Sequence, residues 1–138
     1  MDCYTTADED EANVLFQNTF YDPDGNPISQ MTGLDCEHRV LQNFETPALI
    51  QGFNPVNATD VAFRTPTLQA VHYLRWVVHY LKDQDVLKFG FGIENDVQML
   101  KNAGMTGMLG FQRSDDYVIW HQRNVLNIPR HRDVVSMA

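Results

Sequence analysis

The sequence has no long apolar run and little cysteine. No apolar run in the 138-residue sequence approaches the roughly 20 residues that a membrane-spanning helix needs. No basic segment followed by an apolar one opens the chain. Two cysteines, Cys3 and Cys36, are too few for a disulfide framework and fit a reducing compartment. We therefore expect a protein without a membrane segment that is intracellular, either nuclear or cytoplasmic.

Basic residues are scarce and unevenly placed. The net charge is −8, and residues 1–30 hold seven acidic residues but no Lys or Arg. The remainder is nearly neutral, and its C-terminal part carries Arg113, Arg123, Arg130 and Arg132. The sequence thus lacks the strong basic surface of a non-specific nucleic-acid binder, but this charge distribution does not exclude a phosphate-bearing ligand.

The length of the chain predicts one domain. Residues 1–12 are polar and acidic, so we expect them to form a flexible tail. Residues 13–138 are then expected to form a single domain with its own core.

Apolar runs separated by turn residues predict strands in the first half of the chain. Dense turn chemistry at residues 22–27 (Asp-Pro-Asp-Gly-Asn-Pro) separates two such runs. The predicted strands cover residues 14–21, 28–36, 47–53 and 60–64, and together they indicate an antiparallel meander.

The apolar period changes to about three and a half after Leu68, which predicts an amphipathic helix to Lys82 with Thr67 as its N-cap. A buried strand over residues 86–91 and a second helix over residues 94–103, ended by Gly104, follow. A last strand over residues 117–120 is a weaker prediction. This order of elements favours an α/β sheet with helices packed on it.

Two acidic residues stand one residue apart on a predicted strand. Asp35 and Glu37 are at i and i+2, so both side chains leave the same face of the strand. Neighbouring carboxylates repel each other unless a cation lies between them, and Mg²⁺ prefers hard oxygen ligands of this kind. A third acidic residue, Asp96, lies in the first turn of the second predicted helix. Taken alone, Asp35 and Glu37 also fit ordinary solvent-facing strand residues, and Asp96 also fits an acid favoured by the dipole at a helix N-terminus.

Three blocks of sequence resemble the DEDD 3′–5′ exonucleases, most closely the branch of ribonuclease D and the Werner exonuclease. Residues 33–37 (Gly-Leu-Asp-Cys-Glu) resemble the first exonuclease motif, and residues 47–51 (Pro-Ala-Leu-Ile-Gln) resemble the strand that follows it. Residues 88–96 (Lys-Phe-Gly-Phe-Gly-Ile-Glu-Asn-Asp) resemble the second motif. The resemblance covers residues 33–104, with a faint continuation at residues 133–138.

The resemblance implies a ribonuclease-H-like mixed sheet, an antiparallel meander plus parallel strands, with flanking helices. It also implies hydrolysis of nucleic-acid phosphodiesters, DNA or RNA, from a free 3′ end by two-metal-ion catalysis. On this basis Asp35, Glu37 and Asp96 are the catalytic residues and the ligands of Mg²⁺ or Mn²⁺.

The chain departs from the family pattern in two places. Neither Tyr-x-x-x-Asp nor His-x-x-x-x-Asp, the pattern that supplies the fourth ligand, follows Asp96. His38 stands where many members have Trp. The expected domain is therefore C-terminally incomplete, with activity reduced by the missing ligand and with an exposed face through which the chain can form a homo-oligomer. An inactive exonuclease-like module that binds nucleic acid or a protein stays open as the alternative.

Other residues have less specific interpretations. His72 and His79 lie seven apart on the first predicted helix, a spacing that suggests metal but is more typical of interface or core histidines. Cys36 should point away from the acids into the sheet, which argues against a nucleophile. The phenylalanines and Trp76 are expected in the core.

Overall fold

The computed structural model describes residues 2–41, 44–65 and 74–113. Six strands and three helices lie in these ranges. In chain order they are β1 (Asp2–Thr6), α1 (Glu9–Phe20), β2 (Met31–Leu41), β3 (Phe44–Asn54), β4 (Thr59–Arg64), α2 (Arg75–Lys82), β5 (Leu87–Gly90), α3 (Ile93–Asn102) and β6 (Phe111–Arg113).

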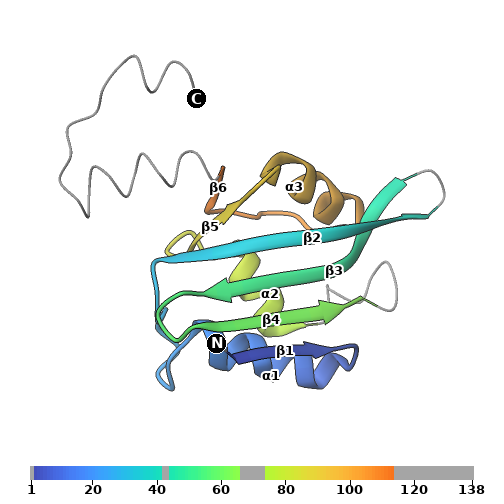
Figure 1. Cartoon of the computed structure of the whole chain (residues 1–138). Helices are drawn as coiled ribbons and strands as arrows, with labels where there is room; N and C mark the ends of the chain where they lie inside the picture. Colours follow the sequence, from blue (N-terminus) through green and yellow to red (C-terminus); the bar gives the residue numbers. More distant parts are fainter. Residues whose placement is uncertain (1, 42–43, 66–73, 114–138) are drawn as a thin grey trace, which may run out of the picture.

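The strands form one mixed sheet in the order β1-β4-β3-β2-β5-β6. The meander β2-β3-β4 is antiparallel, while β1 pairs with β4, β5 with β2 and β6 with β5 in parallel. Figure 1 shows that the two long central strands, β2 and β3, run through the middle of this sheet. The predicted combination of a meander with parallel strands is confirmed.

The hydrophobic core lies on one face of the sheet. Figure 1 shows α1 and α2 behind the strands, and residues of both helices share one core cluster with α3 and with alternate residues of β2, β3 and β4. Its largest buried members include Phe16, Phe20, Phe63 and Tyr80. The rings of Phe20 and Tyr80 stack 4.1 Å apart at their centroids. We call the opposite side of the sheet the open face. The strand residues that alternate with the core residues point to this side.

Two predictions for the N-terminal region were wrong. Residues 2–6, expected in a flexible tail, form β1 and pair with β4, while residues 9–20 form α1 rather than the end of a tail and a strand. The Asp8 side chain accepts a hydrogen bond from the Glu11 N–H and caps α1. The buried residues Ala12, Phe16 and Phe20 recur every four positions, which is helical spacing. Their common stripe explains why this apolar run is a helix.

The first predicted helix is described only from Arg75 onward, and its expected N-cap, Thr67, lies outside the described residues. A side chain from another helix caps the described part, because the Asn13 Oδ1 accepts a 2.7 Å hydrogen bond from the Trp76 N–H. This bond joins the first turn of α2 to α1. The Trp76 side chain packs partly buried against the core, as expected.

The remaining predicted elements agree with the structure to within a few residues. The turn at residues 22–27 closes with an Asn26 carbonyl that accepts from the Asp22 N–H. The strand that carries the paired acids starts later and runs further than predicted, as β2. Gly104, with φ of 91°, follows α3 as expected of a C′ glycine. Residues 117–120 and 133–138 lie outside the described residues, and no described helix is long and apolar enough to cross a membrane.

Candidate functional site

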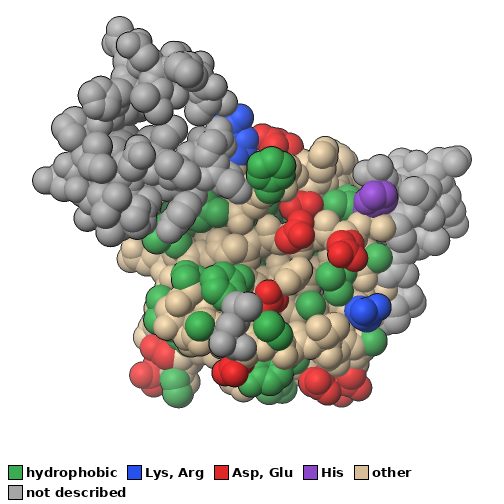
Figure 2. All heavy atoms as spheres, in the orientation of Figure 1, with side chains coloured by type: hydrophobic (Ala, Val, Ile, Leu, Met, Phe, Trp, Pro, Cys, Tyr) green, Lys and Arg blue, Asp and Glu red, His purple; other side chains and the backbone are tan. Residues whose placement is uncertain are grey.

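Asp35 and Glu37 lie on the open face of the sheet, near the middle of β2. Both are exposed, whereas the alternate residues Leu34 and Cys36 point into the core. Their predicted common face is therefore confirmed, as is the inward direction of Cys36. Figure 2 shows acidic side chains gathered over the middle of this face.

Asp96 reaches β2 because β5 ends early. β5 pairs with β2 only as far as Phe89 opposite Gly33, and beyond it the first turn of α3 takes the place of a strand. There the Cys36 backbone N–H donates a hydrogen bond to the Asp96 carboxylate. This contact places a carboxylate from α3 against the strand that carries Asp35.

Two glycines make this approach possible. A Cβ on Gly90 would lie 2.7 Å from the Leu34 carbonyl oxygen and 2.7 Å from Ile93 Cδ1. Gly92, with φ of 64°, takes the left-handed conformation that starts α3. The glycine pair of the second motif thus permits close packing of the turn on β2.

The environment of Asp96 disfavours its charged form. The residue is 4% exposed, and burial raises the pKa of its carboxyl to about 7, helped by the negative charge of Asp35 and opposed by the Cys36 hydrogen bond. The Asp96 Oδ2 atom is one of two buried side-chain polar atoms without a hydrogen-bond partner in the part of the chain described. A buried carboxylate oxygen without a partner is unfavourable unless something positive approaches it.

The chemistry of this pair of carboxylates suits a divalent cation. Asp35 and Asp96 offer hard oxygen ligands, and the free Asp96 oxygen is already buried beside Asp35. Glu37 is on the same face but does not complete the set, because no group of three His, Cys, Asp or Glu side chains among the described residues lies close enough to hold an ion.

We expect Gly90→Ala to destabilise the protein by about 1–3 kcal/mol, because the added methyl group overlaps the Leu34 carbonyl, a backbone atom that cannot move away alone. Chemical denaturation followed by circular dichroism measures this loss. Gly25→Ala is the matched control for a glycine with open space around it, although its φ of 83° adds local strain. A Gly90→Ala protein as stable as the wild type would contradict the close-approach argument.

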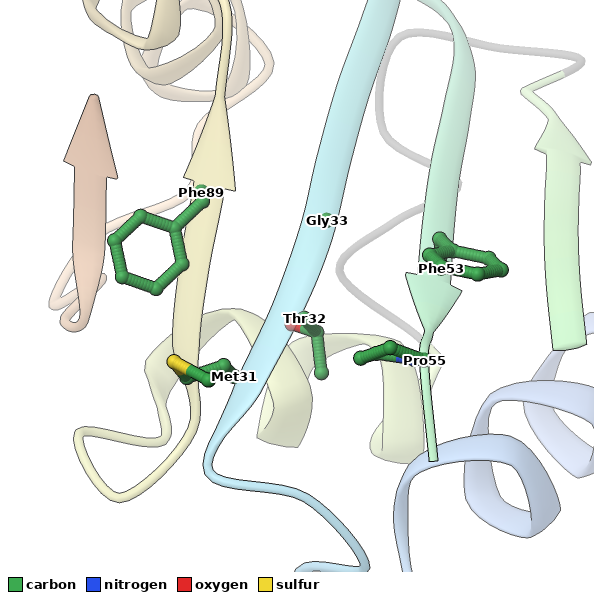
Figure 3. Close-up of a pocket in the computed structure, with 6 residues that line it drawn as sticks. All are labelled: Met31, Thr32, Gly33, Phe53, Pro55 and Phe89. Carbon is green, nitrogen blue, oxygen red and sulfur yellow. The ribbon is translucent and has the colours of Figure 1, made fainter. Parts of the chain in front are cut away.

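A groove on the open face begins at Asp35. It is lined by Asp35, Gly90 and three phenylalanines, Phe53, Phe89 and Phe91, among others, and has a volume of about 480 Å³. An adjoining apolar hollow of about 230 Å³ shares Gly33, Phe53 and Phe89 with it. In Figure 3, Phe89 on β5 and Phe53 on β3 stand on either side of Gly33 on β2. The expectation that the phenylalanines belong to the core was wrong for Phe53 and Phe89, which line the open face outside the core cluster, and for Phe91, which is 93% exposed.

Gln51 on β3 lines the same groove, and Asp60 on β4 is its hydrogen-bond partner. Gln51 faces Asp35 across the β2-β3 pair, and its Nε2 donates to both carboxylate oxygens of Asp60, at 3.0 and 2.8 Å. Sequence reasoning gave neither residue a role. The Pro-Ala-Leu-Ile-Gln block did mark Gln51, but its partner Asp60 follows only from strand pairing.

The predicted histidine pair is described only in part. His79 Nε2 lies 3.7 Å from Asp83 Oδ2, and its ring contacts Tyr21 and Trp76, while His72 lies outside the described residues. Asp83 also accepts a hydrogen bond from the Tyr21 hydroxyl. The observed contacts of His79 are those of an ordinary interface histidine.

Comparison of this fold with solved structures identifies exonuclease domains. The EXD2 exonuclease domain, in a crystal soaked with Mg and GMP, matches with a TM-score of 0.61 and 20% identity over 91% of this chain and 63% of that chain. The same domain soaked with Mn matches with a TM-score of 0.62 and 20% identity, over 98% of this chain and 67% of that one. The catalytic core of RRP6 from Trypanosoma brucei gives 0.62 and 14%, over 94% and 32%.

These matches concern the fold, because the identities are low. No protein-family model and no curated protein matches the sequence. The chain spans less than two thirds of the first EXD2 chain to which it is similar. The six-stranded mixed sheet, its three helices and these structural neighbours together show that the chain has the ribonuclease-H-like fold of these exonuclease domains.

Proposed function

We propose that this chain acts on nucleic acid as a 3′–5′ exonuclease-like domain with a divalent-metal site at Asp35, Glu37 and Asp96. The observation that carries the proposal is the buried, unpartnered Asp96 oxygen beside Asp35, on a fold shared with exonuclease domains. The EXD2 domain in the matched crystals was soaked with Mg or Mn and, in one, with GMP. These soaks support Mg²⁺ or Mn²⁺ as the ions to test here.

Each acidic residue has a distinct part in this proposal. Asp96 and Asp35 approach each other from α3 and β2 and hold the first ion, whose charge offsets their mutual repulsion. Glu37 turns in from the same face of β2 to complete the ligands. When bound, divalent ions lower the pKa of an attacking water and stabilise the leaving 3′ oxygen. The groove beside Asp35, on the open face of the sheet, accommodates the nucleic-acid strand.

The test is a nuclease assay with 5′-labelled single-stranded DNA and RNA. We expect shortening from the 3′ end that requires Mg²⁺ or Mn²⁺ and that falls on the order of a hundredfold or more in Asp35→Asn, because the ion and the phosphate lose their alignment. Asp10→Asn makes the same charge change on exposed α1, away from the open face, and should leave the rate unchanged. Shortening that persists in Asp35→Asn would rule out the proposed site.

A catalytically inactive module is the second candidate. It is favoured by the incomplete grouping of the three acids in the described residues. In that case the same oligonucleotides bind without being shortened. Homo-oligomer formation and an intracellular location stay predictions, which sedimentation and imaging of the tagged chain test.

A further inference from the structure

One large aromatic side chain stands almost fully in solvent next to the acidic site. Phe91 is 93% exposed, more than any other exposed large hydrophobic residue among those described. A single exposed apolar residue is unremarkable by itself. Phe91, however, lines the groove that begins at Asp35, together with Gly90, so its exposed ring adjoins the place where the proposed chemistry occurs.

The turn that carries Phe91 is held on both sides. Gly90 presses against the Leu34 carbonyl, where no Cβ fits, and Gly92 enters α3 in a left-handed conformation. The Gly92 carbonyl accepts a 3.0 Å hydrogen bond from the Asn95 N–H. With its two neighbours fixed by β2 and α3, the backbone at Phe91 presents the ring to the groove at little entropic cost.

The groove offers flat apolar surface rather than hydrogen-bonding side chains. Phe53 and Phe89 line it with Phe91. Of its polar lining residues, Asp35 belongs to the acidic site, and the Gln51 amide nitrogen is already bonded to Asp60. Aromatic surface beside a phosphate-binding site is suited to unpaired nucleobases, because every base has a π-face and stacking needs no particular donor or acceptor.

We propose that Phe91 stacks on one unpaired base within the last two nucleotides of a single strand and so positions the adjacent phosphate at Asp35. This inference rests on the proposed function and adds a substrate-binding residue to it. Recognition by stacking accepts any base, so the substrate class is single-stranded nucleic acid without sequence preference. A paired base presents no free face, so a blunt duplex lacks this contact.

The experiment compares binding of 5′-fluorescent ten-nucleotide DNA strands by anisotropy, with Ca²⁺ in place of Mg²⁺ so that the strand stays intact, which a gel verifies. One strand is unmodified, and others carry a single abasic nucleotide at the last, second-last or sixth position from the 3′ end. We expect the whole 138-residue chain to bind roughly tenfold more weakly when one of the last two bases is missing. Its affinity should not change when the missing base is at the sixth position.

Variants assign the effect to the ring. Phe91→Ala should bind the unmodified strand roughly tenfold more weakly and lose the difference between strands, while Phe91→Trp keeps it. Tyr4→Ala is the matched control, an exposed aromatic on β1 at the far edge of the sheet. Unchanged circular dichroism and melting temperature are expected for Phe91→Ala, because the side chain is exposed.

The outcomes separate the two proposals. Equal binding of all strands by the wild type overturns the stacking role. So does a Phe91→Ala protein that still binds the strands without a base near the 3′ end more weakly. Either result leaves the exonuclease-like function standing. A wild-type protein that binds no strand with Ca²⁺, Mg²⁺ or Mn²⁺ overturns both.

Discussion

Asp96→Asn is expected to be more stable than the wild type by about 2 kcal/mol at pH 8 in EDTA. Folding raises the pKa of Asp96 from 3.8 to about 7, so the folded state binds the extra proton between these values and the wild type loses stability as pH rises through this window. Asparagine does not titrate and escapes that loss. Urea denaturation at pH 4.5 and pH 8 measures the difference, which should be small at the lower pH.

Mn²⁺ should reverse this order. An ion that binds only the folded wild type adds roughly 3 kcal/mol at a hundred times its Kd, whereas Asp96→Asn should gain little. Glu94→Gln is the matched control, since Glu94 is an exposed acid in the same turn of α3, with only a 4.0 Å ion pair to Arg113. An Asp96→Asn protein that is less stable than wild type at pH 8 would show that this carboxylate serves packing rather than a site.

Lys88→Ala is expected to cost about 3–4 kcal/mol of unfolding free energy, because Lys88 is a fully buried lysine on β5. Its Nζ donates to the carbonyl oxygens of Asp83 (2.6 Å) and Leu109 (2.8 Å), which ties two loops to the strand. Alanine leaves a cavity and two carbonyls without this donor. Lys88→Met, which refills most of the volume, should lose about half as much. Urea denaturation measures both variants.

The pH dependence of the free energy of unfolding tests whether the buried amine of Lys88 causes this difference in stability. Burial lowers its pKa from 10.5 to about 8, partly offset by Asp83. The unfolded chain therefore holds the proton that the folded chain releases between pH 8 and 10, and wild-type stability should rise over this window. Both Lys88 variants should lack the rise. Lys101→Met, at an exposed position on α3, should keep it; if it does not, the rise has another origin.

Local patterns predicted the centre of the domain well and its beginning badly. The alternation around Asp35 and the turn at residues 22–27 are short-range signals, and both agree with the structure. In α1 the apolar residues look like a strand when read as a run, and only their spacing from Ala12 to Phe20, with the Asp8 cap, favours a helix. β1 was unpredictable locally, because a polar segment becomes a strand only where β4 offers it an edge.

Local sequence patterns also fail to predict which residues line the groove. Phe53, Phe89 and Phe91 are all phenylalanines in apolar runs, so their composition predicts burial for each. The direction of β3 and β5 and the turn between two glycines decide that all three line the open face. No pattern within one segment contains that information.

The sequence by itself determined the three acids, the strand that carries the first two, the glycines that frame the second motif, and the excess of negative charge. These are properties of residue type and spacing, which no packing changes. The tertiary structure alone decided that Asp96 lies buried against β2 with one oxygen unpartnered, that the three acids do not form one group close enough to hold an ion, and that Phe91 is exposed beside Asp35. Distance and burial depend on segments about sixty residues apart in the chain, and these meet only where β5 ends and α3 begins.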